Sequence, residues 1–184
     1  MVLIFEELNM NHILFPITWK CNLSCEFCAA KNYSEEIDIK ASLEALKTKA
    51  GSVEWVYITG GEPFLIEDLS SVCDQIKSMG FKVGVTTNGT HFCPEIADHA
   101  DRIGISLDGD QKYHDAYRGY GVFDKAVGLF NAVKGKCETV VMSVAFKGND
   151  EALKRLKPIV EEMDPTYWQI QRDMYDQSIK VPSF

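Results

Sequence analysis

The stretch VEWVYITGGEP (residues 53–63) joins a run of β-branched and aromatic residues to a pair of glycines, a glutamate and a proline. The run has the length and composition of a strand, and the glycines and proline after it are typical of a turn. A segment with helical spacing, residues 66–80, comes next. Residues 53–80 therefore predict a strand, a turn and a helix in succession, which is the repeating unit of an α/β fold.

The same unit recurs on both sides of this stretch. Six strand-like runs alternate with five helically spaced segments: strands at 12–19, 53–60, 81–88, 102–109, 138–146 and 166–171, helices at 37–50, 66–80, 92–100, 123–136 and 150–163. This alternation predicts a parallel sheet with right-handed crossovers. No low-complexity tract or linker interrupts it, so we expect one domain over residues 1–184.

Composition restricts the partners of the chain. Its 184 residues include 19 basic and 27 acidic side chains, for a formal charge of −8, which argues against a nucleic-acid or anionic-membrane surface. No apolar stretch approaches the roughly 20 residues that span a bilayer, and the N-terminus lacks the pattern of a signal peptide. The six cysteines form one trio and three scattered singles, unlike a secreted disulfide framework. We expect a soluble, cytoplasmic protein without a membrane partner.

Polar and glycine-rich motifs mark the ends of four predicted strands. CNLSCEFC (21–28) follows the first strand, GGEP (60–63) the second and TTNG (86–89) the third, while SLDG (106–109) ends the fourth. Ligands of parallel α/β sheets bind at the carboxyl ends of the strands. We therefore expect the four motifs to meet at one rim of the sheet.

Cys21, Cys25 and Cys28 place three thiols within eight residues. Zinc is one candidate metal for these thiols. Structural zinc sites have four protein ligands, however, and neither His12 nor His91 continues the cysteine spacing to supply a fourth. Iron–sulfur clusters also bind thiolates, and three thiolates on a four-iron cluster leave one iron open to another ligand. A third alternative is that the cysteines are buried packing residues. The spacing favours a metal site.

CNLSCEFC matches the CxxxCxxC motif of the radical S-adenosylmethionine (radical SAM) enzymes, with Phe27 as the aromatic residue before the last cysteine. The resemblance covers about residues 13–172. It implies a partial (β/α)6 TIM-like barrel with a parallel six-stranded sheet, and one 4Fe-4S cluster held by Cys21, Cys25 and Cys28. It further implies that S-adenosyl-L-methionine binds the open iron and that an external one-electron reductant of flavodoxin or ferredoxin type is needed. The 5′-deoxyadenosyl radical then abstracts hydrogen from substrate.

The other motifs agree with this resemblance. Paired glycines let backbone approach a ligand closely, and a glutamate accepts hydrogen bonds from an ammonium group. In the family, GGEP binds the amino group of S-adenosylmethionine, TNG faces the cosubstrate, and a serine of the fourth strand contacts its carboxylate or ribose. By this resemblance we expect cosubstrate contacts from Phe27, Gly60, Gly61, Glu62, Pro63, Thr86, Thr87, Asn88, Ser106, Asp108 and Arg118.

YHDAYRG (113–119) resembles the H-D-x-x-R-G run that follows SLDG in the molybdopterin-cofactor and SPASM-related branch of the superfamily. There the arginine, here Arg118, can pair with the methionine carboxylate, to which its two-pronged guanidinium is suited. His114 could be a general base, but we interpret it as a helix-start or loop residue because a base must be assigned from geometry.

The last predicted strand offers substrate-side candidates. Alternation places Gln169 and Gln171 on one face and Trp168 on the other. The glutamines are candidates if they face inward, as is Arg172 at the strand end; a solvated edge is the alternative. The remaining cysteines, Cys73, Cys93 and Cys137, are interpreted as packing residues.

About a dozen residues follow the last strand, so we expect a barrel over about 12–172 and a short tail at 173–184. SPASM-type maturases carry a cysteine-rich C-terminal extension for auxiliary clusters, and no such segment is expected here. A lightly capped partial barrel has an open substrate side. That opening suits a peptide or other large substrate, or closure by a second copy of the chain or a partner protein.

Several functions remain open. The first is a minimal radical SAM enzyme acting on a peptide or small molecule. The alternatives are an activating enzyme for a glycyl-radical partner, a nucleotide- or tRNA-directed radical enzyme, which the acidic charge disfavours, and a non-catalytic iron–sulfur protein. GGEP, TNG and SLDG together favour catalysis, because an electron carrier needs no site for an amino-acid ligand.

Overall fold

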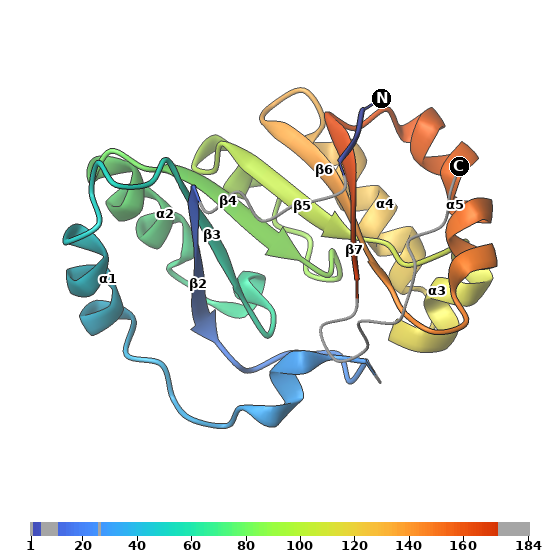
Figure 1. Cartoon of the computed structure of the whole chain (residues 1–184), viewed down its shortest axis with the longest axis horizontal. Coiled ribbons are helices and arrows are strands. Elements are labelled where there is room, and N and C mark those ends of the chain that lie inside the picture. Colours follow the sequence, from blue (N-terminus) through green and yellow to red (C-terminus); the bar gives the residue numbers. More distant parts are fainter. Residues whose placement is uncertain (1, 5–10, 26, 173–184) are drawn as a thin grey trace.

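The computed structural model describes residues 2–4, 11–25 and 27–172 of the chain. The predicted tail at 173–184 lies outside the described residues. Within them, seven parallel strands form one sheet in the order β1-β7-β6-β5-β4-β3-β2 (Figure 1). The strands are β1 (Val2–Ile4), β2 (His12–Thr18), β3 (Trp55–Gly60), β4 (Lys82–Thr87), β5 (Arg102–Ser106), β6 (Glu138–Ala145) and β7 (Tyr167–Arg172).

The six strands predicted from the sequence are β2 to β7, and the expected parallel α/β sheet of a partial barrel is confirmed. The seventh strand, β1, pairs with β7 in parallel, with Leu3 opposite Trp168. It was not predicted because a run of three residues is shorter than the four to eight that a strand pattern needs. Strands β1 and β2 are close in sequence but lie at opposite edges of the sheet.

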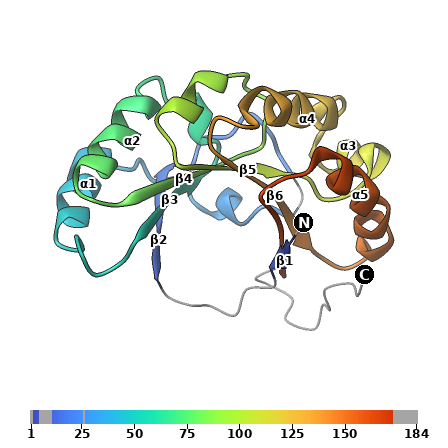
Figure 2. The ribbon, with the colours of Figure 1, turned by 90° about the horizontal axis from the view of Figure 1, so that it is seen from above.

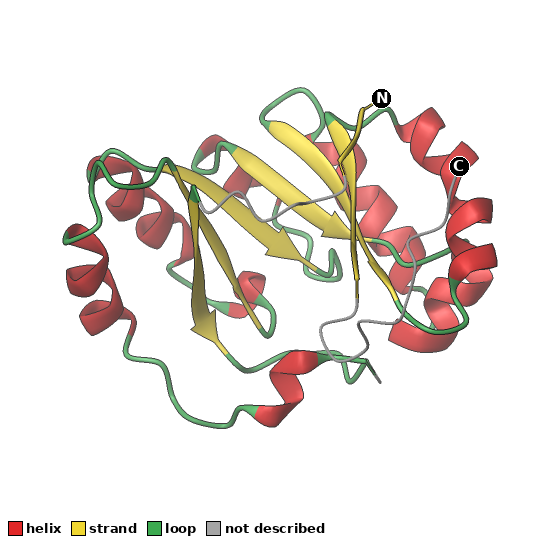
Figure 3. Ribbon diagram, viewed as in Figure 1, coloured by secondary structure: helices red, strands yellow, loops and turns green. Residues whose placement is uncertain are grey.

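The helices cover the outer face of the curved sheet, as Figure 2 shows, and Figure 3 separates the two kinds of element. They are α1 (Ile39–Lys47), α2 (Leu69–Ser78), α3 (Gln111–Arg118), α4 (Val122–Val133) and α5 (Asp150–Met163), with 3₁₀ turns η1 (Ala29–Asn32), η2 (Pro63–Leu65) and η3 (Pro94–Asp98). No helix of this described portion is both long and apolar enough to cross a membrane.

Two helical details differ from the sequence analysis. The segment 92–100 forms the 3₁₀ turn η3 instead of an α-helix, since the few residues between Pro94 and strand β5 leave no room for several α-helical turns. Helix α3 was not predicted at all. Its sequence, QKYHDAYR, is mostly polar and has no Leu, Ile, Val or Met, so it lacks the apolar stripe by which the other helices were found.

Alternate strand residues form the core beneath the helices. Val56, Ile58, Val85, Ile103 and Ile105 are at most 1% exposed and pack against the helical layer. This two-residue period is what parallel strands require when one face is covered by helices. The opposite set of strand residues is left to line the concave inner face.

The amino ends of the strands carry an aromatic cluster on the inner face. The Arg102 guanidinium carbon lies 4.0 Å from the centre of the Trp55 ring and 5.0 Å from that of Tyr167. The guanidinium also donates to the Tyr57 hydroxyl and to the Glu138 carboxylate, the latter at 2.5 and 2.8 Å. The amino end of the barrel is therefore packed with side chains, and the space for a ligand lies at the carboxyl end.

Candidate functional site

A cavity of about 250 Å³ opens at the carboxyl ends of the strands. Residues from all four strand-end motifs line it, as sheet geometry led us to expect. Of the predicted site residues, Pro63 and Asp108 do not line the cavity. Those that do are Cys21, Cys25, Phe27, Cys28, Gly60, Gly61, Glu62, Thr86, Thr87, Asn88, Ser106 and Arg118.

The cysteine loop follows β2 directly and folds back on itself. The Cys28 amide donates to the Cys25 carbonyl at 3.2 Å, and the Leu23 amide donates to the Cys21 sulfur at 3.4 Å. Aromatic rings join the two ends of the loop, because Trp19 stacks on Tyr33 with centroids 4.4 Å apart. The three thiols are thereby held at one side of the cavity.

The environment of the thiols differs from one cysteine to the next. Cys25 is buried, whereas Cys21 is exposed. Burial raises the pKa of both thiols, and the positive charge of Arg118 partly offsets this for the pKa of Cys25. A raised pKa favours the protonated thiol, and thiolates are the form that binds metals, so a metal must displace the thiol protons when it binds here.

Gly60 and Gly61 bring the end of β3 against the cysteine loop. A Cβ on Gly60 would lie 2.1 Å from the Thr18 carbonyl oxygen, and one on Gly61 would lie 2.2 Å from that of Lys20. The backbone also exchanges hydrogen bonds there, with the Gly61 amide donating to Thr18 and the Glu62 amide to Lys20. Both positions therefore require glycine, because a side chain would displace the loop that carries the cysteines.

Glu62 is fully buried and forms one wall of the cavity. Its Oε1 accepts from the Thr87 hydroxyl at 2.7 Å and the Phe64 amide at 3.0 Å, and its Oε2 accepts from the Asn88 amide at 2.7 Å. Burial raises the pKa of this carboxyl. A carboxylate offers about four acceptor positions, so three internal donors leave capacity for one cationic donor in the cavity.

Asn88 links the TNG segment to the cysteine loop. Its Nδ2 donates to the Asn22 side chain at 3.0 Å and lies 3.7 Å from the Cys21 sulfur. Thr90 completes the link, since its hydroxyl donates to Asn88 and accepts from Asn22. The loop after β4 therefore holds the cysteine loop in place through side-chain amides.

Phe27 is fixed by two neighbours. Its ring stacks on Phe146 with centroids 4.7 Å apart, and the Arg118 guanidinium lies 5.3 Å from its centre. Phe27 stands between Cys25 and Cys28 in sequence, so this packing also positions the end of the cysteine loop. Phe27 also lines the cavity.

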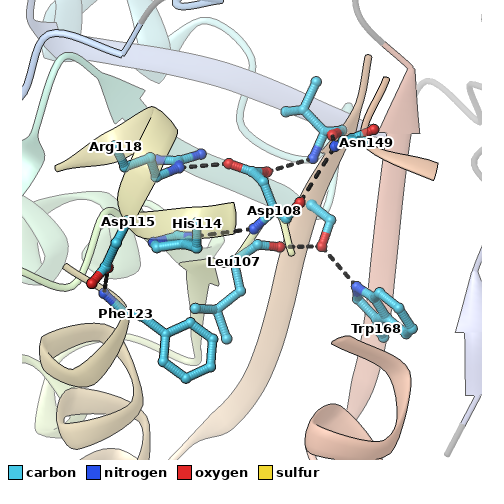
Figure 4. A network of polar contacts seen from close by, with 10 residues as sticks. Leu107, Asp108, His114, Asp115, Arg118, Phe123, Asn149 and Trp168 are labelled. Carbon is cyan, nitrogen blue, oxygen red and sulfur yellow. Dashed lines mark hydrogen bonds and ion pairs between the residues drawn. The ribbon is translucent and has the colours of Figure 1, made fainter. Parts of the chain in front are cut away.

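Asp108 and Arg118 form a buried ion pair beside the cavity (Figure 4). Arg118 Nε donates to Asp108 Oδ2 at 2.6 Å, and Asp108 Oδ1 accepts from the Val144 amide at 2.8 Å. The Asp108 carboxylate is thus used within the protein, and it is Arg118 that lines the cavity. The two Nη groups of Arg118 donate to no acceptor among the described residues, which leaves the end of the fork available to an anion.

His114 lies in the middle of α3, not at a helix start or in a loop, and it is fully buried outside the cavity. Its Nδ1 accepts from the Asp108 amide at 3.1 Å, so the proton of the neutral ring is on Nε2. Nε2 has no hydrogen-bond partner in the described part of the chain. Burial lowers the pKa of His114 to about 4, which keeps the ring neutral. This geometry supports a structural role.

The ends of β5, β6 and β7 are braced behind this ion pair. The Ser143 hydroxyl donates to the Leu107 carbonyl and accepts from Trp168 Nε1 at 2.9 Å (Figure 4). Asn149 donates to the Val144 carbonyl at 2.8 Å and accepts from the Phe146 amide at 3.0 Å. These contacts keep the strand ends that carry Ser106, Val144 and Gln171 in register.

The structure adds cavity residues that the sequence did not single out: Leu23, Ala30 and Thr59. Thr59 belongs to the inward-facing set of its strand, so strand alternation was the signal that could have found it. Val144 of β6 also lines the cavity. Gln171 and Arg172, left undecided from the sequence, both line the cavity.

The donor set fits the groups implied by the cysteine motif. Thiolates are the protein ligands of iron–sulfur clusters, and three of them leave one iron open. In the described residues no three His, Cys, Asp or Glu side chains are gathered closely enough to hold a single metal ion. A buried carboxylate and a guanidinium stand beside the thiols, which suits an amino acid bound by both of its charged groups.

A parallel partial barrel with three loop cysteines at its carboxyl end defines the class of protein. The family model of the radical SAM superfamily matches residues 15–157, and the chain belongs to that superfamily.

Relatives within the superfamily differ in what they do. The chain is 26% identical over 164 residues to the Fe-coproporphyrin III synthase of Methanosarcina barkeri, covering 83% of this chain and 40% of that protein. It is 32% identical over 126 residues to the mycofactocin maturase MftC of Mycolicibacterium smegmatis, covering 62% and 32%. The chain thus spans less than half the length of these relatives.

A solved structure supports the fold. The crystal structure of Streptococcus suis SuiB bound to S-adenosylmethionine superposes with a TM-score of 0.74 at 19% identity, covering 89% of this chain and 39% of that one. At this level of identity the likeness establishes a shared architecture, while roles of single residues must be argued from the cavity itself.

Proposed function

We propose that this protein is a radical SAM enzyme that cleaves S-adenosylmethionine reductively and uses the 5′-deoxyadenosyl radical to abstract a hydrogen atom from a peptide or small-molecule substrate. One observation carries the proposal. The three cysteines of the CxxxCxxC loop line the same cavity as Glu62, Asn88, Ser106 and Arg118. An electron-transfer protein would need the cysteines but no site for an amino acid beside them.

The residues of this cavity divide the work between two ligands. Cys21, Cys25 and Cys28 would hold a 4Fe-4S cluster, which when bound supplies the single electron that splits the sulfonium into methionine and the radical. Glu62 would accept from the cosubstrate ammonium, because its carboxylate retains an acceptor position facing the cavity. Arg118 would receive the carboxylate on its free Nη groups while Asp108 holds its Nε.

The remaining polar groups suit the rest of the cosubstrate. Ser106 lines the cavity, and its hydroxyl is bonded to no other described side chain or backbone group, so it is free to bind a ribose or carboxylate oxygen. Phe27, held flat by Phe146, offers an apolar surface for the adenine. Thr87 orients Glu62 instead of facing the ligand directly, since its hydroxyl donates to that carboxylate.

Partners and surroundings follow from the same chemistry. We propose an external one-electron reductant of flavodoxin or ferredoxin type and a reducing, cytoplasmic location, because free thiols and a reduced cluster need both. The cavity opens at the carboxyl ends of the strands, which is consistent with a peptide substrate or with closure by a second copy of the chain or a partner protein. Two of the relatives are, by name, an Fe-coproporphyrin III synthase and a mycofactocin maturase.

The test is anaerobic reconstitution with iron and sulfide, followed by addition of dithionite and S-adenosylmethionine. We expect about four irons per chain, the number in a cubane cluster, and formation of 5′-deoxyadenosine measured by liquid chromatography. A fully loaded protein that forms no 5′-deoxyadenosine would contradict the proposed function. A protein that takes up no iron would contradict the assignment of the cysteines.

A further inference from the structure

The β7 edge of the cavity carries two polar side chains that the proposed chemistry does not use. Gln171 and Arg172 are the last residues of β7, both are exposed, and both line the cavity together with the cysteine loop. Neither side chain makes a hydrogen bond or ion pair with any residue that the structure describes. This edge therefore presents donors without an internal acceptor.

Arg172 differs from the other charged residues that line the cavity in its bonding partners. Among the described lining residues, three are charged apart from the cysteines: Glu62, Arg118 and Arg172. Glu62 is bound by three internal donors, and Arg118 is paired with Asp108. Arg172 has no acidic partner within residues 2–4, 11–25 and 27–172. A guanidinium that lines a cavity without such a partner attracts an anion.

The chemistry of this edge selects a kind of anion. A guanidinium presents parallel N–H donors that match the two oxygens of a carboxylate or phosphate. The neighbouring Gln171 adds an amide donor, and Val144, its register partner on β6, adds an apolar surface to the same wall. Partial exclusion of water by such a wall strengthens a charge-assisted hydrogen bond.

We propose that Arg172, assisted by Gln171, forms a subsite that binds an oxyanion of the substrate, a carboxylate or a phosphate. The subsite would orient the substrate across the cavity from the cysteine loop. This inference rests on the proposed function, because it assigns the substrate to the part of the cavity that the cosubstrate residues leave open. It makes Arg172 a specificity-determining residue.

The experiment measures how fast phenylglyoxal, which modifies guanidinium groups, reacts with each arginine of the reconstituted protein. Peptide mass spectrometry reads the adducts at Arg172 and at Arg155, an exposed arginine paired with Asp110 outside the cavity. The probes are glutarate, inorganic phosphate, the neutral diamide glutaramide, and S-adenosylmethionine. At saturating probe we expect glutarate or phosphate to slow modification of Arg172 about tenfold by mass action, with Arg155 unaffected.

Each probe result has one meaning. Protection by glutarate alone identifies a carboxylate subsite, protection by phosphate alone identifies a phosphate subsite, and protection by both identifies a general oxyanion subsite. The proposal is overturned if neither glutarate nor phosphate protects Arg172, if glutaramide protects it equally well, or if Arg155 is protected to the same extent. Protection by S-adenosylmethionine would assign Arg172 to the cosubstrate and also overturn it.

A variant comparison repeats the test without chemical modification. Isothermal titration calorimetry with the protecting probe would be carried out on the wild type, Arg172→Gln and the control Arg155→Gln. We expect the heat of probe binding to be lost in Arg172→Gln and kept in Arg155→Gln, and a retained binding heat in Arg172→Gln would contradict the subsite. Formation of 5′-deoxyadenosine by the wild-type preparation is assayed in parallel, so a failure of the proposed function can be told from a failure of the subsite.

Discussion

Two arginines stand at opposite ends of the same sheet and have similar partners. Arg102, at the amino end, has a side chain that is 15% exposed and binds Glu138. Arg118, at the carboxyl end, has a side chain that is 10% exposed and binds Asp108. Both charges are thus largely removed from water and compensated by one carboxylate. By burial and pairing alone, the two sites would be judged alike.

They differ in what surrounds the guanidinium. Aromatic rings of Trp55, Tyr57 and Tyr167 cover Arg102 on the inner face, and its Nη groups are used by Tyr57 and Glu138. Arg118 uses only Nε for Asp108 and presents its Nη groups beside the cysteine loop. A buried arginine whose donors are all bound packs the barrel, whereas one with free donors at a cavity can bind a ligand. In parallel barrels the amino end commonly provides stability and the carboxyl end function.

The largest effect is expected from replacing a cysteine at the carboxyl end of the sheet, compared with one at the amino end. Cys25→Ser should abolish cluster binding and 5′-deoxyadenosine formation, because a hydroxyl is a poor iron ligand and only two thiolates remain. The matched change at the amino end, Cys137→Ser, should leave iron content near about four per chain. Iron and sulfide analysis with product chromatography measures both. If Cys25→Ser keeps the full iron content, the carboxyl-end assignment is wrong.

The second prediction compares the effects of replacing Arg118 and Arg102 on cosubstrate cleavage and on stability. Arg118→Gln should lower 5′-deoxyadenosine formation at fixed cosubstrate about a hundredfold, equivalent to about 3 kcal/mol, because it removes a charged donor and leaves Asp108 buried without its partner. Arg102→Gln should instead lower the free energy of unfolding by about 2 kcal/mol through lost cation–π and hydrogen-bond contacts. It should leave the apparent affinity for S-adenosylmethionine unchanged.

Kinetics of cosubstrate cleavage and urea unfolding monitored by tryptophan fluorescence separate these effects. An Arg102→Gln protein with weakened cosubstrate binding and normal stability would remove the distinction between the two ends. The same holds for an Arg118→Gln protein that is less stable but binds S-adenosylmethionine normally.

The third prediction concerns pH and the network behind Arg118. The pKa of His114 is lowered to about 4 by burial, below its ordinary value of 6.5. As the pH falls, the unfolded chain therefore takes up the proton first, so this contribution to stability is complete above pH 6.5 and is lost toward about pH 4. The loss is at most about 3 kcal/mol.

His114→Asn provides the comparison, because an amide oxygen can replace Nδ1 as acceptor for the Asp108 amide without titrating. Urea unfolding between about pH 7 and pH 5 should show a smaller loss of stability in the variant than in the wild type. His99→Gln, which changes a partly buried histidine paired with Asp74, should keep the wild-type slope. Identical slopes for all three proteins would show that His114 does not carry the effect.

The smallest expected effect is on the cluster potential. Asn88→Ala removes the amide donor that lies 3.7 Å from the Cys21 sulfur. Hydrogen bonds to cluster sulfurs favour the reduced state, so the midpoint potential should become more negative while iron content is kept. Potentiometric titration followed by electron paramagnetic resonance measures this. Thr90→Val is the control, because it weakens the link to Asn22 but keeps the donor to sulfur; an equal shift in both variants would contradict a direct effect.

Much of the fold could be predicted because its signals are local. Strands β2 to β7 are runs of apolar or β-branched residues separated by helically spaced segments, and each was placed within a few residues. The cysteine loop and GGEP follow strands directly, so their meeting at one rim needed only the parallel order. Strand β1 was missed because it is short, and α3 because its sequence lacks an aliphatic stripe.

For the candidate site, the sequence could predict which residues reach the rim of the sheet but not which partners they bind there. Asp108 shows the limit: it was expected to contact the cosubstrate, but its carboxylate binds Arg118 and the Val144 amide and does not line the cavity. Val144 lies far along the chain on another strand, and strand register brings it there. Periodicity cannot supply such a contact, because it reports the face of a residue and not its partner.

From the sequence alone one can derive a parallel α/β sheet, three thiols on one loop and a rim where glycine, serine and carboxylate motifs collect. These properties follow from spacing within short segments. Tertiary structure decided which charges of the described residues neutralise each other and which line the cavity: Asp108 neutralises Arg118, Glu62 is bound by its neighbours, and Arg172 lines the cavity. That outcome depends on distances between strands far apart in sequence, and only the folded chain determines those distances.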